Sequence, residues 1–514
     1  MTALSNHETI AVIGSGAMGS GIAQVAACAG HPVWLYDAKD GAAAQGRANI
    51  LASLDRLVSK GKVNEDERNT IASRISVASS LSVMTDARLV IEAIVENLEV
   101  KRAVFSELEG IVSPSCILAT NTSSLSVTAI AAGLEFPGRL AGFHFFNPAP
   151  IMKLVEIVSG LASEPTTLDT LYDTALAWGK EPVRATSTPG FIVNRVARPF
   201  YAEALRLLEE GAASVATIDA VIKESGGFRM GPFELMDLIG HDVNFAVTRS
   251  VFEAYFGDPR FRPSLTQQEL IAAGWLGRKT GRGFYNYTAD APQQSPDTAS
   301  PSQIPAFVVI EGNLGPAEAL VGELEAKGLM TVTREAGTGH IRIPGATLAL
   351  SDGRTATSRA TGGDRPDLIL FDLALDYTKA SRIAIAPADQ APSSALSAAL
   401  GLFQSLGMAV SVIDDVPGLI VLRTLAMLAN EGAEAALQQV ASPTDIDRAM
   451  TLGVNYPRGP LSWADQIGAA RILTVLENLQ MSYGDDRYRA SQFLRRSVNA
   501  QHSLHPQASP DAIN

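Results

Sequence analysis

The feature that most constrains this chain is an internal repeat. Residues 189–240 and 417–468 align without a gap at a constant offset of 228 residues and share 15 of their 52 positions. The shared positions lie in four separate motifs and include Pro-Gly, Ile-Val, Arg, Ile-Asp, Gly-Pro and Ile-Gly. One offset held across separate motifs indicates that a structural unit has been duplicated. We therefore expect the chain to contain two copies of one pair of domains.

Each repeat is helical in pattern and follows a stretch that reads as α/β. In the first half, short apolar runs alternate with helix-like stretches, which is typical of a parallel sheet covered by helices. Helices are expected at 17–30 and, broken near Gly61, at 41–73. The expected strands are 9–14, 32–37, 89–94, 116–119, 140–145 and 153–158. Alanine- and leucine-rich helical periodicity then runs to about residue 255.

The second half repeats the order but lacks a glycine loop. Strands are expected in FVVIEG, DLILFDLAL, RIAIAPA and VSVIDD, and a Pro-, Ser- and Gln-rich segment precedes them. The fold class is thus an α/β Rossmann-type dinucleotide-binding domain followed by an all-α domain, with a degenerate second α/β plus α copy. The expected parts are 1–188 (cofactor domain), 189–288 (helical), 289–305 (linker), 306–415 (degenerate α/β), 416–500 (second helical) and 501–514 (frayed tail).

Composition excludes several classes of protein. The chain has 41 basic and 54 acidic residues, a formal charge of −13, and no basic block, which disfavours nucleic acid or an anionic membrane as partner. No apolar run reaches about 18 residues, and the N-terminus lacks a secretory pattern. The two cysteines, Cys28 and Cys116, form neither a disulfide framework nor a metal cluster, so we expect a cytoplasmic protein without a metal.

A glycine-rich motif predicts the cofactor site. It follows an apolar strand, opens a helix, and comprises Gly14, Gly16, Ala17, Met18 and Gly19. Such glycines let the backbone approach a pyrophosphate, whose charge the helix N-terminus stabilises. Asp37 lies about 20 residues further on, where a carboxylate accepts hydrogen bonds from an adenosine ribose. Because Asp37 would repel a 2′-phosphate, NAD is favoured over NADP.

Four polar residues stand out in apolar or strand-like settings: Ser123, His144, Glu156 and Asn194. Each has a purely structural interpretation. His144 could be a hydrogen-bonded core residue, Glu156 an outward-facing strand residue, and Ser123 or Asn194 a helix cap. Together they fit the oxidation of a secondary alcohol, in which a histidine removes the hydroxyl proton. A carboxylate orients its ring, and neutral donors hold the substrate oxygen.

These motifs resemble the 3-hydroxyacyl-CoA dehydrogenases of β-oxidation and fatty acid metabolism, over about residues 8–287. The quoted matches are GSGAMGSGIA, VIEAIVENLEVK, NTSSL, HFFNPAPIMKLVEIV, TPGFIVNR, GPFELMDLIG and GRKTGRGFYNY. The resemblance implies His144 as general acid/base, Glu156 as its partner, and Ser123 and Asn194 as substrate-oxygen contacts. It also implies that Glu96, Lys101, Ser123 and Asn147 line the nicotinamide-ribose end of the site, and that the substrate has the 3S configuration.

The resemblance further implies coenzyme A contacts at Ser53 and Lys60, which are seven residues apart and share a helix face. A solvated charged helix face is the alternative. The length and the repeat resemble the long bacterial type of phenylacetate catabolism, which oxidises 3-hydroxyadipyl-CoA. Because Leu422 replaces Asn194 in the second copy, we expect a single active site. The second helical domain would pack on the first, giving a monomer with an internal pseudo-dimer or a homo-oligomer.

Other functions remain open at this point. A general β-oxidation or 3-hydroxybutyryl-CoA dehydrogenase would share every motif above. A sugar-acid dehydrogenase, a non-catalytic NAD-sensing module and a multifunctional β-oxidation chain are less consistent with the motifs and their order. A dicarboxylic acyl group would need a cation at its far end, and the candidates are Arg198, Arg229 and Arg249.

Overall fold

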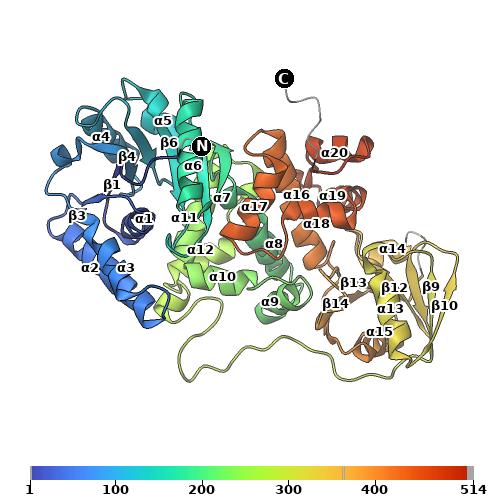
Figure 1. Ribbon diagram of the computed structural model, residues 1–514. Helices are drawn as coiled ribbons and strands as arrows, with labels where there is room; N and C mark the ends of the chain where they lie inside the picture. The colour runs from blue at the N-terminus through green and yellow to red at the C-terminus, as the bar shows by residue number, and fades with distance from the viewer. Residues whose placement is uncertain (1–2, 362, 364, 506–514) are drawn as a thin grey trace. The chain divides into compact units, whose positions relative to one another are not determined.

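The computed structural model describes residues 3–361, 363 and 365–505 (Figure 1). The chain divides into two compact units. The first comprises Met1–Arg195 and Gln438–Val454, and the second comprises Val196–Leu437 and Asn455–Asn514.

The first unit is an α/β domain. Its strands are β1 (Thr9–Ile13), β2 (Val33–Tyr36), β3 (Ile75–Val77), β4 (Ala87–Glu92), β5 (Ile117–Thr120), β6 (Leu140–Phe145), β7 (Leu154–Ser159) and β8 (Glu181–Thr186). Its helices are α1 (Ala17–Cys28), α2 (Ala42–Ser59), α3 (Glu65–Ser73), α4 (Leu98–Glu109), α5 (Val127–Ala131), α6 (Pro165–Ala177) and α17 (Pro443–Gly453), and α7 (Val193–Val196) stands at its boundary.

The eight strands form one sheet in the order β3-β2-β1-β4-β5-β6-β7-β8. The predicted parallel arrangement holds from β3 to β6, but β7 runs antiparallel to β6. Sequence analysis missed β3 and β8. β3 has only three residues and a single buried position, and β8 alternates buried and exposed residues without a strongly apolar run. The antiparallel turn matters for function because it sets His144 opposite Glu156.

The first unit also takes one helix from the second repeat. α17 packs on β7 and β8, and Arg448 of α17 forms an ion pair with Glu181 at 3.0 Å. Thr186 N–H donates to the carbonyl of Val440 at 2.9 Å. The segment that the sequence assigns wholly to a second helical domain therefore contributes residues 438–454 to the first unit.

The second unit combines helices from both repeats with a second sheet. Its helices are α8 (Arg198–Glu209), α9 (Val215–Glu224), α10 (Pro232–Ile239), α11 (His241–Ala254), α12 (Leu265–Ala272), α13 (Ala319–Lys327), α14 (Ala356–Thr361), α15 (Ser393–Ser405), α16 (Val421–Leu437), α18 (Pro460–Ile467), α19 (Ala469–Tyr483) and α20 (Gln492–Asn499). Its strands are β9 (Phe307–Glu311), β10 (Thr331–Glu335), β11 (His340–Ile343), β12 (Ala346–Leu350), β13 (Leu368–Phe371), β14 (Arg382–Pro387) and β15 (Ala409–Val412).

The second sheet is a reduced and rearranged version of the first. Its order is β10-β9-β11-β12-β13-β14-β15, with parallel and antiparallel neighbours. The four predicted strands correspond to β9, β13, β14 and β15, and β10, β11 and β12 were missed. β10 is largely exposed, so its sequence carries no buried apolar face to mark it as a strand.

The repeat extends to backbone conformation. Gly190 and Gly418 both have φ of 78°, and the next residues, Phe191 and Leu419, share the left-handed region at 47° and 55°. A non-glycine residue rarely adopts this conformation, so its recurrence at the 228-residue offset is a specific match. The Pro-Gly turn of the first repeat is therefore rebuilt in the second.

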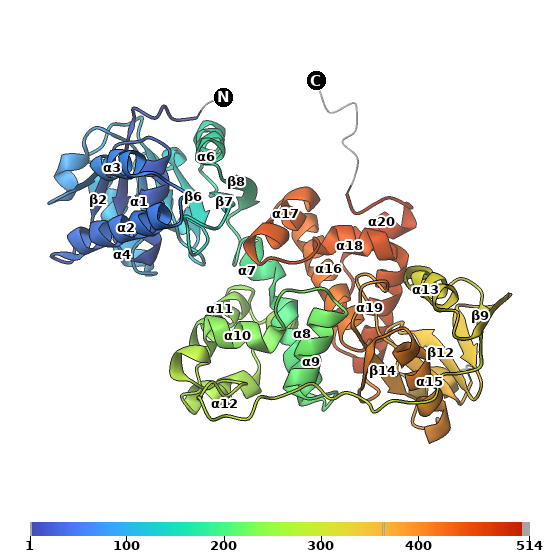
Figure 2. The same ribbon diagram turned by 60° about the horizontal axis from the view of Figure 1, so that its bottom comes forward.

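Within the second unit, α8 of the first repeat packs against α16 of the second, as Figure 2 shows. A fully buried Arg423 of α16 donates to fully buried Glu203 of α8 at 2.8 Å and to Glu210 at the same distance. Burial works to raise the pKa of Glu203, but Arg206 and Arg423 hold it below its usual value. The two repeats thus share an internal interface built on a paired buried charge.

The expected linker and the described part of the expected tail each make hydrogen bonds to other elements of the second unit. Residues 289–305 have no helix or strand, but Asp297 accepts from Ser214 and Thr217 at 2.9 Å and Ala299 N–H donates to Val410. Of the predicted frayed tail, residues 506–514 lie outside the described residues. Leu504 is fully buried, and its N–H donates to Asp465 at 2.9 Å. The described part of the chain includes no helix long and apolar enough for a membrane span.

Candidate active site

The structure brings His144 and Glu156 together at the antiparallel β6–β7 pair. His144 Nδ1 lies 2.6 Å from Glu156 Oε2, and both side chains are buried, at 7% and 1% exposure. The two residues are direct cross-strand partners, so their side chains project from the same face of the sheet. His144 Nε2 makes no hydrogen bond to any described residue, which leaves it available as an acceptor. The pair has the geometry of a histidine base oriented by a carboxylate.

Glu156 is itself held in place by backbone donors. The N–H groups of Ile192 and Val193 donate to its Oε1 at 3.1 Å each. These residues follow the Pro-Gly turn, whose Phe191 ring centroid lies 5.8 Å from the His144 ring. The carboxylate therefore has one oxygen committed to the chain and the other to the imidazole, which fixes the orientation of both side chains.

The NTSSL segment supports this pair from the neighbouring strand. Asn121 Oδ1 accepts the backbone N–H of Phe145 at 2.8 Å, beside His144. Asn194 Nδ2 lies 3.5 Å from the carbonyl oxygen of Ser123, and both side chains are half-buried. Ser123 does not cap the following helix, because that role falls to Ser126, which accepts from Ala129. Sequence reasoning missed Asn121, although it opens the quoted motif.

A cluster of charged side chains, with Glu92 and Lys101 buried and Glu96 partly exposed, contacts the NTSSL segment. Lys101 is 1% exposed and contacts Glu92 at 2.6 Å and Glu96 at 3.3 Å. Glu96 also accepts from Thr122 Oγ1 at 2.6 Å and from the N–H of Ser123 at 3.1 Å. Burial works to raise the pKa of Glu96, but the Thr122 hydrogen bond and the Lys101 charge hold it below its usual value. An ionised Glu96 therefore organises the loop that carries Ser123.

Glu92 is a second residue that sequence reasoning missed. It is fully buried at the end of β4, where it binds Lys101 and accepts from Thr120 Oγ1 at 2.7 Å. Its signal was present in VIEAIVENLEVK, as a carboxylate within an apolar run nine residues before a lysine. A buried lysine needs such a partner, because an unpaired buried charge is costly.

The glycine loop has the shape required for a phosphate cradle. Gly14 has a positive φ of 97°, and a Cβ on Gly19 would overlap the carbonyl oxygen of Gly14. At Gly16, in contrast, a Cβ would meet nothing within 4 Å, so the loop presents open space there. Gly16 is the N-cap of α1, whose first residues are Ala17 and Met18, and no side chain caps this terminus. The free N–H groups and the open face fit a dinucleotide pyrophosphate.

Asp37 follows β2 and closes the loop. Its Oδ2 accepts both the N–H and the hydroxyl of Ser15 at 2.8 Å, and its Oδ1 accepts from Lys39 N–H at 3.0 Å. Burial works to raise the pKa of Asp37, but these hydrogen bonds lower it below its usual value. The carboxylate is therefore ionised at neutral pH and still has lone pairs for a ribose hydroxyl.

Three further predicted residues lie wholly or partly at the surface. Asn147 is exposed after β6, Lys60 is exposed at the C-cap of α2, and Ser53 is half-buried on the same helix. Within the described part of the chain, none of the three hydrogen-bonds to the His144–Glu156 pair. Of the three candidate arginines, Arg229 and Arg249 are exposed and only Arg198 is buried. No group of three potential metal-ligating side chains occurs among the described residues.

The second copy has lost the histidine but kept a carboxylate. At the 228-residue offset, Asp372 replaces His144 and Ala384 replaces Glu156, and Asp372 N–H donates to the carbonyl of Ala384. The Asp372 carboxylate accepts the N–H groups of Ile420, Val421 and Leu422, the turn equivalent to the one that binds Glu156. Burial raises the pKa of Asp372 to about 6, against those hydrogen bonds. Asp372 therefore holds the turn at residues 420–422 in place, and it cannot act as a histidine base.

Comparison with known proteins agrees with these features. Residues 9–188 match the NAD binding domain of 3-hydroxyacyl-CoA dehydrogenase, and residues 190–287 and 418–508 each match its C-terminal domain. Residues 348–417 match the reduced Rossmann-fold domain of 3-hydroxybutyryl-CoA dehydrogenase. The chain belongs to the 3-hydroxyacyl-CoA dehydrogenase family, with a Rossmann-type NAD-binding domain, helical domains and a reduced second Rossmann-fold domain.

Among its relatives, 3-hydroxyadipyl-CoA dehydrogenase of Escherichia coli (strain K12) is 45% identical over 96% of this chain and 97% of its own. Mitochondrial hydroxyacyl-coenzyme A dehydrogenase of Homo sapiens is 42% identical over 54% of this chain and 90% of its own. A crystal structure of 3-hydroxybutyryl-CoA dehydrogenase from Escherichia coli K12 has a TM-score of 0.88, at 43% identity, and covers 96% of this chain and 99% of its own.

Proposed function

We propose that this chain oxidises (3S)-3-hydroxyadipyl-CoA to the corresponding 3-oxoacyl-CoA with NAD, in phenylacetate catabolism. The observation that carries the proposal is the buried His144–Glu156 pair, at 2.6 Å, in a chain whose two copies both align with 3-hydroxyadipyl-CoA dehydrogenase. A protein with only the first copy would match the shorter mitochondrial type equally well.

In this proposal His144 is the general base. Its Nε2 accepts the proton of the substrate's 3-hydroxyl, and the Glu156 carboxylate stabilises the imidazolium that forms. Asn194 and Ser123 donate hydrogen bonds to the substrate oxygen as the carbonyl develops. Glu156 stays in place because Ile192 and Val193 hold its second oxygen. In the reverse reaction His144 returns the proton as a general acid.

The cofactor residues follow from the glycine loop. Bound NAD would supply the acceptor for the hydride that leaves C3 of the substrate. Gly14, Gly16, Ala17, Met18 and Gly19 would hold its pyrophosphate, and Asp37 its adenosine ribose. Glu96, Lys101, Ser123 and Asn147 would line the nicotinamide-ribose end. For coenzyme A, we propose that Ser53 and Lys60 on α2 supply contacts, with the lysine facing a phosphate.

A second candidate function is the oxidation of 3-hydroxybutyryl-CoA, because the solved Escherichia coli structure that covers 96% of this chain bears that name. Comparing kcat/KM for 3-hydroxybutyryl-, 3-hydroxyhexanoyl- and 3-hydroxyadipyl-CoA separates the two. We expect kcat/KM to be higher for 3-hydroxyadipyl-CoA than for 3-hydroxyhexanoyl-CoA, whose acyl chain has the same length but lacks the terminal carboxylate. Equal or lower values for 3-hydroxyadipyl-CoA would contradict it.

Three wider features belong to the same proposal. The expected domain division is kept as part of this proposal, except that residues 438–454 belong to the first unit. A single active site in the first copy follows because, in the second copy, Asp372 and Leu422 stand at the positions of His144 and Asn194. The α8–α16 interface supports a monomer with an internal pseudo-dimer. The charge of −13 and the two unpaired cysteines support a cytoplasmic protein with no nucleic acid or membrane partner.

A further inference from the structure

The second unit contains a cavity that the catalytic proposal does not use. It has a volume of about 580 Å³ and runs along α8, with walls that include Tyr201, Leu205, Thr248 and Phe261. Every residue that lines it belongs to the second unit. Apolar side chains and a few polar groups in one concave site are typical of a binding pocket for a small organic molecule.

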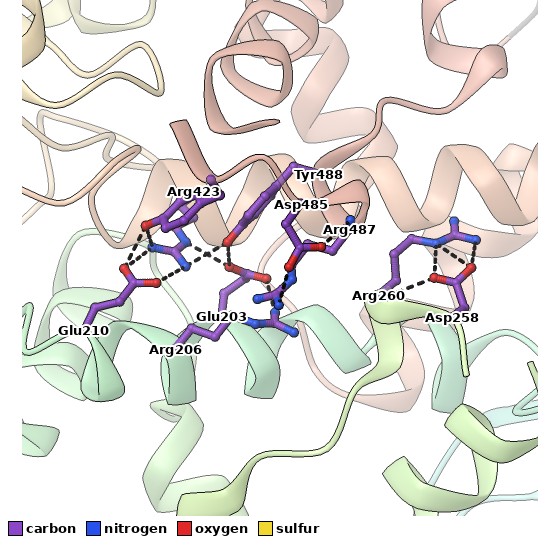
Figure 3. Close-up of polar contacts among 10 residues, drawn as sticks. Glu203, Arg206, Glu210, Asp258, Arg260, Arg423, Asp485, Arg487 and Tyr488 are labelled. Atoms are coloured by element: carbon purple, nitrogen blue, oxygen red, sulfur yellow. Dashed lines mark hydrogen bonds and ion pairs between the residues drawn. The ribbon is translucent and has the colours of Figure 1, made fainter. Parts of the chain in front are cut away.

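Several arginines line this cavity, and most of them are neutralised. Figure 3 shows Arg206 bonded to Glu203, Arg260 bonded to Asp258, and Arg487 bonded to Asp485. Arg260 also lies within 3.8 Å of Glu431 and Glu434. These guanidinium groups are therefore part of the internal charge network and have no need of an external anion.

Arg198 is different. It lines the same cavity and is 94% buried, with an exposed fraction of 6%. Its guanidinium makes one hydrogen bond, from Nη1 to Thr248 Oγ1 at 3.1 Å, and stacks over the Tyr201 ring at 4.9 Å. Among the described residues its Nε has no partner, and no carboxylate forms an ion pair with it. Burial is the main influence on its pKa and lowers it, as expected for a cation without a counter-charge.

The repeat shows that the fold does not require this charge. At the 228-residue offset the position of Arg198 is occupied by Ala426, which is fully buried in the equivalent helix α16. The same helix is therefore built in the second copy without a cation. A buried and unpaired guanidinium is unfavourable on its own, so its presence only in the first copy points to a ligand.

We propose that this cavity binds a carboxylate group, held by Arg198 and oriented through Thr248. A planar carboxylate suits a single guanidinium, because the two can share parallel hydrogen bonds. The apolar wall beside it suits the methylene chain that a dicarboxylate carries. The ligand is a free dicarboxylate that binds independently of the acyl-CoA, because every residue that lines the cavity belongs to the second unit, whereas His144 and Glu156 belong to the first. The carboxylate site therefore does not rest on the proposed function.

Calorimetric titration of the full chain with adipate tests the site directly. We expect Arg198→Met to weaken adipate binding at least tenfold, whereas Arg249→Met should leave it within twofold. Arg249 is the matched control because it is 64% exposed and paired with Glu253. Hexanamide, which lacks the charge, should bind far more weakly than adipate. If Arg198→Met does not fold, Arg198→Lys keeps the charge, loses the planar fork, and should still weaken adipate binding.

Kinetics test whether the site is independent of the acyl-CoA substrate. For an independent site, Arg198→Met should change kcat/KM for 3-hydroxyadipyl-CoA and for 3-hydroxyhexanoyl-CoA by the same factor while adipate binding is lost. A loss of at least tenfold for 3-hydroxyadipyl-CoA alone would contradict an independent site. The proposal is overturned if adipate binds wild type and Arg198→Met equally, if it does not bind at all, or if inorganic phosphate binds as tightly. A wild-type enzyme without preference for 3-hydroxyadipyl-CoA would refute the proposed substrate, and the adipate titration would still decide the cavity.

Discussion

Replacement of Glu156 by glutamine tests how the structure controls the tautomer of His144. The N–H groups of Ile192 and Val193 both point at Glu156 Oε1, so the amide oxygen of a glutamine must take that position. The amide NH₂ group then faces His144 Nδ1, where Glu156 Oε2 now lies at 2.6 Å. Two donors cannot share this contact, so Nδ1 loses its proton and Nε2 carries it. In that tautomer Nε2 cannot accept the substrate proton.

The size of the loss follows from the charge that is removed. For charge centres about 4 Å apart and an effective dielectric constant of about 20, the attraction between carboxylate and imidazolium is about 4 kcal/mol. This corresponds to roughly a 10³-fold lower rate, and the wrong tautomer adds to it. We therefore expect Glu156→Gln to lower kcat by about 10³- to 10⁴-fold.

The assay is the appearance of NADH absorbance with saturating 3-hydroxyacyl-CoA, together with the Kd of NAD from fluorescence titration. The glycine loop is unaffected by the substitution, so the Kd should stay within about twofold. A Glu156→Gln enzyme that keeps more than about a tenth of the wild-type kcat would refute the reasoning, because its histidine would then be a competent base without the carboxylate.

Three further predictions follow from individual contacts. Asp37→Ser should weaken the binding of NAD and improve the binding of NADP, because it removes a carboxylate that repels a 2′-phosphate. The ratio of kcat/KM for the two cofactors measures this change, and an unchanged ratio would count against the assignment of Asp37 to the ribose. Arg423→Met should destabilise the protein by about 3 kcal/mol in urea unfolding, since among the described residues it leaves fully buried Glu203 with Arg206 as its remaining ion-pair partner, whereas the double variant with Glu203→Gln should recover much of the loss; equal losses would argue against the pairing. Glu96→Gln should lower the free energy of unfolding by about 1 kcal/mol or less at pH 7, because the partly exposed side chain is screened by solvent. Since the folded-state pKa of Glu96 is depressed, its contribution is present above about pH 4.5 and lost as pH falls through the folded pKa, so the two melting curves should converge in acid.

Much of the catalytic half of this molecule could be predicted from local patterns. The glycine loop, the strand before it and Asp37 after the next strand are adjacent in sequence, so spacing alone indicated their geometry. His144 and Glu156 were predicted as partners from their motifs. The antiparallel β6–β7 register that makes them cross-strand neighbours could not be predicted, because apolar runs do not reveal strand direction.

What the sequence did not reveal depends on contacts between distant residues. The swap of α17 into the first unit places residues 438–454 beside β7 and β8, about 260 positions after those strands, and no local pattern encodes it. Burial of Arg198 depends on α11 and the segment after it, so the three candidate arginines were equivalent until the structure separated them. Asp372 was missed because its role comes from a turn 48–50 residues further on.

The central claim is that the imidazole of His144 meets the 3-oxygen of the substrate while Glu156 holds its other nitrogen. A crystal structure of the non-reacting complex with NAD and a 3-oxoacyl-CoA product measures this directly. We expect Nε2 within about 3.2 Å of the 3-oxygen, with the Nδ1–Glu156 contact retained. A 3-oxygen more than about 5 Å from Nε2, bound instead to another side chain that can exchange a proton, would contradict the account.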